Sequence, residues 1–156
     1  MSVRQSVMRQ YQAIVNDASG QWDNTVRPVP SEGWITTMRK ALGMSGAQLA
    51  ARLGLSRARV SQAARAEREG AVTLKTMQSM AEAMGGRFVY AIVPPDRVEH
   101  IVKAQAEKKA RAVVKKASTH MALEDQSLRR SRNAEEIERL VAEYLRRMPA
   151  DLWSEP

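Results

Sequence analysis

The 156-residue sequence contains no cysteine, which excludes disulfides, thiolate catalysis and cysteine-built zinc sites. Aromatic residues make up only 4% of the chain, so we expect helices packed by Ala, Leu, Met and Val rather than a β-sandwich. Two histidines offer little for a histidine-built metal site, and no apolar run approaches the roughly 20 residues of a membrane span. The first residues lack the apolar stretch of a signal peptide. These absences favour a cytoplasmic protein with no membrane contact.

Motifs of catalysis are missing too. The sequence has no glycine-rich phosphate loop and no His-Glu-x-x-His metal pair. The partners of a Ser–His pair would meet only in space, and no serine or histidine is singled out here. We therefore expect no enzymatic activity, no metal and no cofactor.

Positive charge is in excess, with a formal net charge of +8. Residues 33–84 carry eight Lys or Arg against three Glu, giving +5, and residues 97–117 carry seven against two, again +5. Residues 118–156 carry six Arg against eight acids, giving −2. A basic surface attracts a polyanion such as nucleic acid by releasing condensed counterions. The alternative is a solubilising charge without a ligand.

Apolar periodicity predicts a mainly α fold. We divide the chain into an N-terminal helix and linker (1–32), a central helical domain (33–86), a short strand (87–94) and a C-terminal helical region (95–156). The expected helices cover residues 2–18, 33–42, 46–53, 57–68, 74–84 and 95–118, with a last helix capped by Asn133 and Glu136. Trp34 and the methionines Met38, Met77, Met80 and Met84 are expected in the core.

The β-rich residues 87–93 stop at Pro94-Pro95 and predict a strand. A single strand leaves its backbone donors and acceptors unpaired, so it needs a partner. Pairing with the same strand of another copy would make a homodimer. The rival is pairing with the linker around Thr25 to Arg27.

Residues 46–65, GAQLAARLGLSRARVSQAAR, have the spacing of a helix-turn-helix. Ala50 is small where the second helix packs on the first, and Gly54 tolerates a positive φ in the turn. Ser56 then starts the reading helix. The inward apolar positions are Leu49, Leu53, Leu55, Val60 and Ala63. The alternative is an ordinary helical hairpin with a solvated arginine face.

The exposed side chains of the expected reading helix have chemistries that suit base edges. Arginine pairs with guanine, glutamine pairs with adenine, and alanine contacts the thymine methyl group. The candidate base contacts are Arg57, Ala58, Arg59 and Gln62. The candidate phosphate contacts are Lys40, Ser45, Gln48, Ser56 and Ser61.

Residues 34–84 resemble the Cro/C1-type (XRE-like) helix-turn-helix fold. The sequence departs from that family at Gly46, where a glutamine that contacts phosphate often opens the second helix. A homodimer of this kind reads a palindromic operator with two helices about 34 Å apart, one turn of DNA.

A more specific resemblance covers almost the whole chain. GWITTMRKALGMSGAQLAARLGLS (33–56), TLKTMQSMAEAMGGRFVYAIVPPD (73–96), HMALEDQ (120–126) and LWSEP (152–156) are similar to the mobile mystery protein A family. Members commonly accompany mobile mystery protein B, which has a Fic domain. The resemblance implies a toxin–antitoxin module in which this chain is the antitoxin and an autorepressor.

Fic enzymes typically transfer AMP from ATP to a hydroxyl group. Many are silenced by a helix bearing (Ser/Thr)-x-x-x-Glu-(Gly/Asn), whose glutamate occupies the arginine that should hold the ATP γ-phosphate. Glu124 lies in a similar pattern in which His120 replaces the hydroxyl residue, and Glu135 follows Ser131 in a second one. We favour Glu124, although inhibition by simple blockage of the toxin's site is the alternative.

Two further features leave their roles open. Trp153 either contacts a partner or folds back on the last helix. The basic run at 103–116 either grips DNA or an acidic toxin, or forms a solvated helix face. The competing overall interpretation is a stand-alone transcriptional repressor whose C-terminal helices only dimerise.

Overall fold

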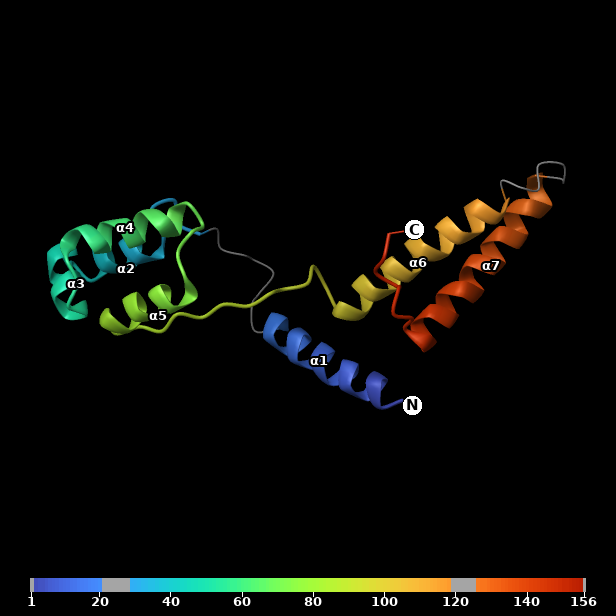
Figure 1. The fold of residues 1–156 in the computed structure, drawn as a ribbon, viewed down its shortest axis with the longest axis horizontal. Coiled ribbons are helices and arrows are strands. Elements are labelled where there is room, and N and C mark those ends of the chain that lie inside the picture. The colour runs from blue at the N-terminus through green and yellow to red at the C-terminus, as the bar shows by residue number, and fades with distance from the viewer. Residues whose placement is uncertain (1, 21–28, 119–125, 156) are drawn as a thin grey trace. The chain divides into compact units, whose positions relative to one another are not determined.

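The structure, a computed structural model, describes residues 2–20, 29–118 and 126–155. Within these ranges it contains seven α-helices and no β-strand (Figure 1), which confirms the mainly α fold. The chain divides into two compact units, Trp22–Ala91 and a discontinuous unit made of Met1–Gln21 and Ile92–Pro156. None of the described helices is long and apolar enough to cross a lipid bilayer.

Four short helices form the first unit, and side-chain caps fix where three of them begin. The hydroxyl oxygens of Ser45, Ser56 and Thr73 each accept a hydrogen bond from the backbone N–H three residues further on. Gly54 has φ 65° and ψ 30°, the left-handed conformation expected of the turn. The helices are α2 (Trp34–Ala41), α3 (Gly46–Leu53), α4 (Arg57–Arg68) and α5 (Leu74–Ala83).

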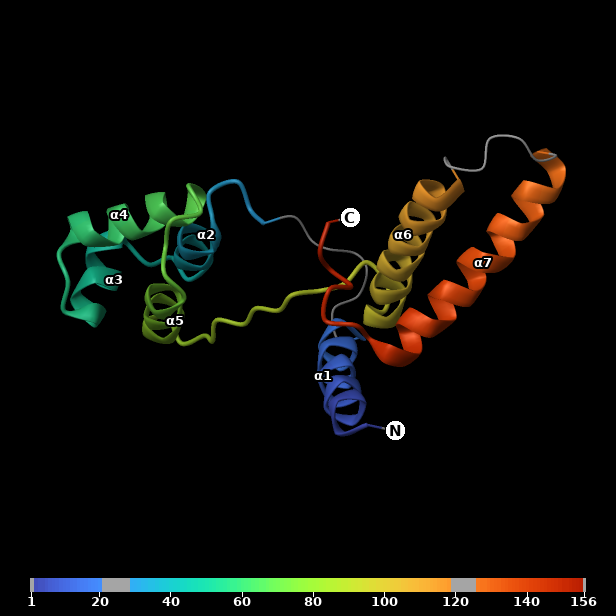
Figure 2. The ribbon, with the colours of Figure 1, turned by 45° about the vertical axis from the view of Figure 1, so that its right-hand side comes forward.

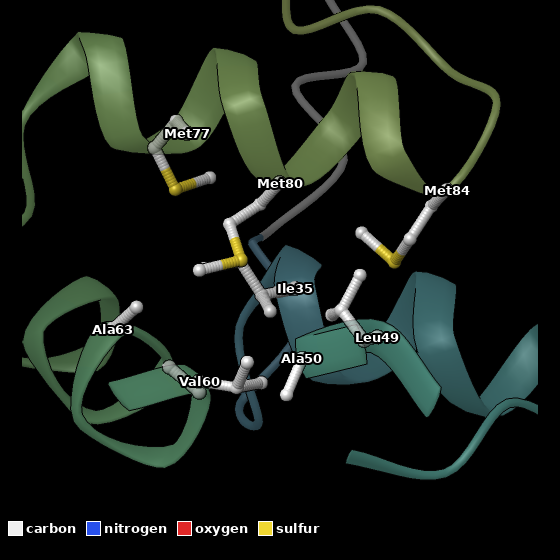
Figure 3. Packing of buried hydrophobic residues seen from close by; sticks show 9 residues of the cluster. Ile35, Leu49, Ala50, Val60, Ala63, Met77, Met80 and Met84 are labelled. Atoms are coloured by element: carbon white, nitrogen blue, oxygen red, sulfur yellow. The ribbon is translucent and has the colours of Figure 1, made fainter. Parts of the chain in front are cut away.

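Two methionines of α5 and its C-cap residue, Met84, cover the core of this unit. Figure 3 shows Met77, Met80 and Met84 turned toward side chains of the other helices. Each of the three is buried, as the sequence predicted. The side chains beneath them include Ile35, Leu49, Ala50, Val60 and Ala63.

Trp34 is 48% exposed, so its assignment to the core was wrong. It is the first residue of α2, where its indole borders a hollow instead of filling the centre of the bundle. Met38, one turn further on, lines the same hollow and is 36% exposed, so its assignment to the core was wrong as well.

A carboxylate from α4 closes the start of α2. Glu67 accepts hydrogen bonds from the backbone N–H of Trp34 (2.5 Å) and of Ile35 (3.0 Å). Its carboxylate also lies so close to Gly33 that a Cβ there would be 2.8 Å from Glu67 Oε2. Gly33 has φ 80° and ψ 163°, a region that essentially only glycine occupies. The contact therefore depends on glycine at residue 33.

The second unit consists of α1 (Val3–Gly20), α6 (Val98–Ser118) and α7 (Gln126–Arg147). Helices α6 and α7 lie side by side (Figures 1 and 2). Ala106 and Ala110 of α6 are completely buried, and such small side chains let two helix backbones approach closely. Val102 and Val141 extend this core on the two helices.

The side chain of Asn16 in α1 caps α6. Its Oδ1 accepts a hydrogen bond from the Val98 N–H (3.1 Å), and its Nδ2 donates to Glu99 Oε2 (3.0 Å). Hydrogen bonds from the Glu99 backbone and from Asn16 lower the pKa of Glu99 to about 2, with help from Arg97. The sequence placed the start of this helix at Pro95, and this cap places it at Val98.

The chain turns sharply after α7 and packs back on α6. Met148 has a positive φ of 47°, and four residues later the side chain of Leu152 is completely buried. Gln105 of α6 donates to the Leu152 carbonyl (2.8 Å). Lys109 contacts both the carbonyl and the carboxylate of Asp151, and this ammonium lowers the pKa of that carboxyl group.

The strand predicted at 87–94 is not present, which corrects that expectation. A strand requires a ladder of hydrogen bonds with a neighbour, and the described ranges of a single copy supply no such neighbour. The rings of Phe88 and Tyr90 stack with 5.7 Å between their centroids. The other proposed partner, Thr25 to Arg27, lies outside the described residues.

The cap predicted at Asn133 was also wrong, because α7 already begins at Gln126. Residues 126–132 contain neither proline nor glycine and include three arginines and a leucine, which are strong helix formers. Asn133 is thus inside the helix. Glu136 pairs with Arg139 at 2.6 Å, and this pairing lowers the pKa of Glu136.

Candidate nucleic-acid interface

Helix α4 has one buried and one exposed face. Val60, Ala63 and Ala64 pack into the core, whereas Leu55, which was predicted to face inward, is 36% exposed. Ser56 accepts a hydrogen bond from the Arg59 N–H (3.2 Å) at the start of the helix. The exposed residues include all four candidate base contacts, namely Arg57, Ala58, Arg59 and Gln62. The face turned away from the core therefore carries the side chains that sequence reasoning selected.

Three arginines line a hollow on one flank of α4, which we call the arginine hollow. It has a volume of about 340 Å³ and is lined by Arg39 of α2 and by Arg57 and Arg68 of α4. Ser45, Gly46 and Ser61 complete its polar side, so the N-terminus of α3 opens into the same space. Guanidinium groups, hydroxyls and the backbone N–H groups of a helix start are all donors to an anion. This flank suits a phosphate group.

A second hollow, of about 320 Å³, lies on the opposite flank of α4. Arg59 and Gln62 line it from α4, and Thr73 and Thr76 line it from the start of α5. Thr73 accepts a hydrogen bond from the Thr76 N–H (3.1 Å), which fixes this edge. The exposed face of α4 is thus bordered by donors on both sides.

A comparison with protein-family models matches residues 35–90 to the family described as helix-turn-helix. Residues 35–90 form a helix-turn-helix domain. This match supports a DNA-binding transcription regulator as the class of protein. Neither the comparison with curated proteins nor that with solved structures found a match.

Four of the five candidate phosphate contacts, Lys40, Ser45, Gln48 and Ser56, have hydrogen-bond partners within the chain. Ser45 and Gln48 form a reciprocal capping box, with distances of 2.8 Å and 3.1 Å. Lys40 pairs with Glu32 at 2.6 Å, and this contact lowers the pKa of the Glu32 carboxyl group. Ser56 caps α4, whereas Ser61 lines the arginine hollow. All five side chains are exposed.

Three further arginines of this domain lie at the interface and were not predicted from the sequence. Arg68 follows Arg57 by eleven residues, a spacing that keeps both on one face of α4. Arg65 follows Gln62 by three residues, is exposed, and pairs with Glu69 at 2.8 Å. Helical spacing alone points to both of these residues. Arg39 reaches the site from another helix, so only the packing reveals it.

The candidate toxin contacts belong to the other unit. Ser131 and Glu135 are exposed and lie four residues apart on α7, so they share a face. Trp153 is 56% exposed, beside the completely buried Leu152. His120 and Glu124 lie outside the described residues. Among the described residues, no group of histidines and acids is placed to hold a metal ion.

Proposed function

We propose that the chain is an antitoxin that binds operator DNA, represses its own operon and neutralises a Fic-domain toxin. The DNA-binding part rests on one observation, the exposed face of α4 with Arg57, Ala58, Arg59 and Gln62 opposite a buried apolar face. In the major groove these side chains distinguish guanine, thymine and adenine by their edges. The protein acts in the cytoplasm, where its operator is accessible.

Phosphate contacts orient α4 in the groove in this proposal. The arginine hollow receives one backbone phosphate, held by Arg39 and Arg68 with the start of α3. Thr73 and Thr76, at the start of α5, contact a second phosphate on the opposite flank of α4. These phosphate contacts increase affinity without sequence preference. Because they are electrostatic, salt weakens them.

Replacing Arg57 by alanine is expected to reduce operator affinity by about five- to 150-fold, because a lost bidentate base contact is worth about 1–3 kcal/mol. The preference for one base pair should relax at the same time. Titration of labelled DNA libraries, followed by sequencing of the bound fraction, measures both effects. Arg147→Ala removes the same charge from the other unit, outside the basic run at 103–116, and is the matched control.

The phosphate contacts have a different signature in the same titration. Lys40→Ala should weaken binding to all sequences equally and reduce the slope of log affinity against log salt by about 1. An Arg57→Ala protein that keeps the wild-type sequence preference would contradict the assignment of the reading face.

The antitoxin role rests on the resemblance of HMALEDQ (120–126) and of the sequence around 73–96 to the mobile mystery protein A family. A specific observation favours a separate binding function. Helices α1, α6 and α7 have their own buried core, distinct from that of the helix-turn-helix domain. The half-exposed Trp153 is a suitable contact for a toxin.

Glu124→Ala is expected to leave the complex with the neighbouring Fic protein intact and to restore AMP transfer. The reason is that a glutamate which occupies the γ-phosphate arginine blocks productive ATP binding. Co-purification measures the complex, and labelled AMP on the target protein measures transfer. Glu135→Ala, on α7, is the control and should leave the toxin silent.

Unchanged silence of the Glu124→Ala complex would remove the glutamate mechanism in favour of blockage of the toxin's site. The absence of a Fic-encoding neighbour would favour the alternative function, a stand-alone repressor whose C-terminal helices only dimerise. We propose no catalytic activity for the chain in either case.

A further inference from the structure

Residues 87–93 leave the helix-turn-helix domain as an extended segment. No described residue exchanges a backbone hydrogen bond with them. Every one of these residues carries a backbone donor and an acceptor. The segment is therefore an open strand edge of the kind that pairs with a further strand.

Four large apolar side chains of this segment are exposed, whereas Phe88 is half-buried against the core of the helix-turn-helix domain. Val89 is 51% exposed, Tyr90 66%, Ile92 91% and Val93 41%. Native proteins cover or charge such edges to prevent uncontrolled association. In this segment the only charged residue is Arg87, at its first position. Charge therefore does not protect the edge, which indicates that another strand covers it.

We propose that this segment pairs with the same segment of a second copy, antiparallel, about a two-fold axis that passes midway between Tyr90 and the partner's Tyr90. Residues opposite each other in an antiparallel pair have their side chains on the same face of the sheet. A two-fold axis is therefore possible only where one residue lies opposite the same residue of the partner. Gly86 and Pro94 bound the segment, and Tyr90 is its midpoint. Any other axis shortens the ladder or brings in Pro94, which lacks an N–H.

This register makes every cross-strand pair compatible. Phe88 lies opposite the partner's Ile92, and Val89 lies opposite the partner's Ala91, so the inner pairs are apolar. Arg87 lies opposite the partner's Val93, which keeps the two arginines at opposite ends of the ladder. The stacked rings of Phe88 and Tyr90 already lie on one face of the extended chain.

A hollow beside Phe88 accepts the partner's side chain. It has a volume of about 430 Å³, and its lining includes Trp34, Met38, Phe88 and Val89. The partner's Ile92, opposite Phe88, is placed to enter it. A stable dimer buries about 800 Å² on each partner, which a seven-residue ladder reaches only with flanking surface. Trp34 and Met38, which are 48% and 36% exposed in the wall of the hollow, add apolar surface beside the ladder.

This inference deepens the proposed function, since a two-fold dimer is what a palindromic operator requires. The dimer interface can be tested without DNA. The test of the interface is therefore independent of the test of operator binding. A protein that dimerises through this segment but ignores operator sequence would remove the proposed DNA reading alone. A protein that reads its operator while the crosslinking pattern below fails would remove this interface alone.

Single cysteines in the cysteine-free chain test the register. Tyr90→Cys should form a disulfide-linked dimer under mild oxidation, because facing Cα atoms are about 4.5–5.5 Å apart and disulfides span about 4.4–6.8 Å. Ile92→Cys should not, because the two cysteines are then four residues apart along the strands, about 13 Å. Non-reducing electrophoresis gives the result. Crosslinking of Ile92→Cys without Tyr90→Cys, or of neither, overturns the proposal.

Sedimentation of the full chain tests the apolar contact. The wild-type protein should have twice the 17.4 kDa chain mass, and Ile92→Lys should lower dimer affinity by at least tenfold. The monomer tolerates this change because Ile92 is 91% exposed. Val3→Lys, at a site 82% exposed on α1, is the matched control and should remain dimeric. A monomeric wild type, or an Ile92→Lys protein that dimerises normally, overturns the proposal.

Discussion

Alanine in place of Gly33 is expected to destabilise the helix-turn-helix domain by about 1–3 kcal/mol from backbone strain alone, because φ 80° and ψ 163° suit only glycine. A second loss adds to it. The new Cβ would lie 2.8 Å from Glu67 Oε2 and would displace the carboxylate that caps α2. Hydrogen bonds to a charged group contribute about 1.5–3 kcal/mol. Urea unfolding followed by circular dichroism, with hydrogen exchange to assign the unit, measures the change.

Gly46→Ala is the matched control within the same domain. Gly46 begins α3, has no positive φ, and a Cβ there would meet only Arg57 Cγ at 4.0 Å. Alanine in a helix loses less conformational entropy than glycine, so stability should stay the same or rise by up to about 1 kcal/mol. Glu67→Ala separates the lost cap from the strain. Equal unfolding midpoints for Gly33→Ala and the wild type would refute the contribution of this contact.

Leu152→Ala is expected to destabilise the unit of α1, α6 and α7 by about 2–5 kcal/mol. The leucine side chain is completely buried, and its removal costs transfer free energy and leaves a cavity. It lies among residues of α6 and α7 such as Val102 and Val141. Amide hydrogen exchange should show faster opening of α6 and α7 and no change in α2–α5, because the two units have separate cores.

Trp153→Ala provides the control at the adjacent position. Trp153 is 56% exposed, so its truncation should change stability by no more than about 0.5 kcal/mol. If Trp153 contacts the toxin, the same variant should lower toxin affinity while the fold persists. Similar effects of the two substitutions on hydrogen exchange would contradict the packing described for the last turn.

Local signals made the helix-turn-helix domain predictable. Ser45 and Ser56 mark helix starts, and Gly54 marks the turn between them, because capping and left-handed φ depend on single residues. The bounds of α3 agree with the prediction for this reason. The exposure of Arg57 and Gln62 also follows from helical spacing once the start is fixed.

Long-range contacts explain what the sequence did not reveal. The start of α6 depends on Asn16, which is 82 residues from Val98 in the chain. The cap of α2 depends on Glu67, and the arginine hollow depends on Arg39 from a different helix than its other two arginines. Propensity also misled at 87–94, because β-rich residues do not form a strand without a neighbour.

The second unit is assembled from both ends of the sequence, with the helix-turn-helix domain between them. The ribosome releases a chain from its N-terminus, so α1 emerges long before α6, whose first turn Asn16 caps. The helix-turn-helix domain is continuous in the sequence, so all of its residues are synthesised before α6. During translation, α1 therefore has no α6 or α7 to pack against until the whole helix-turn-helix domain has been synthesised.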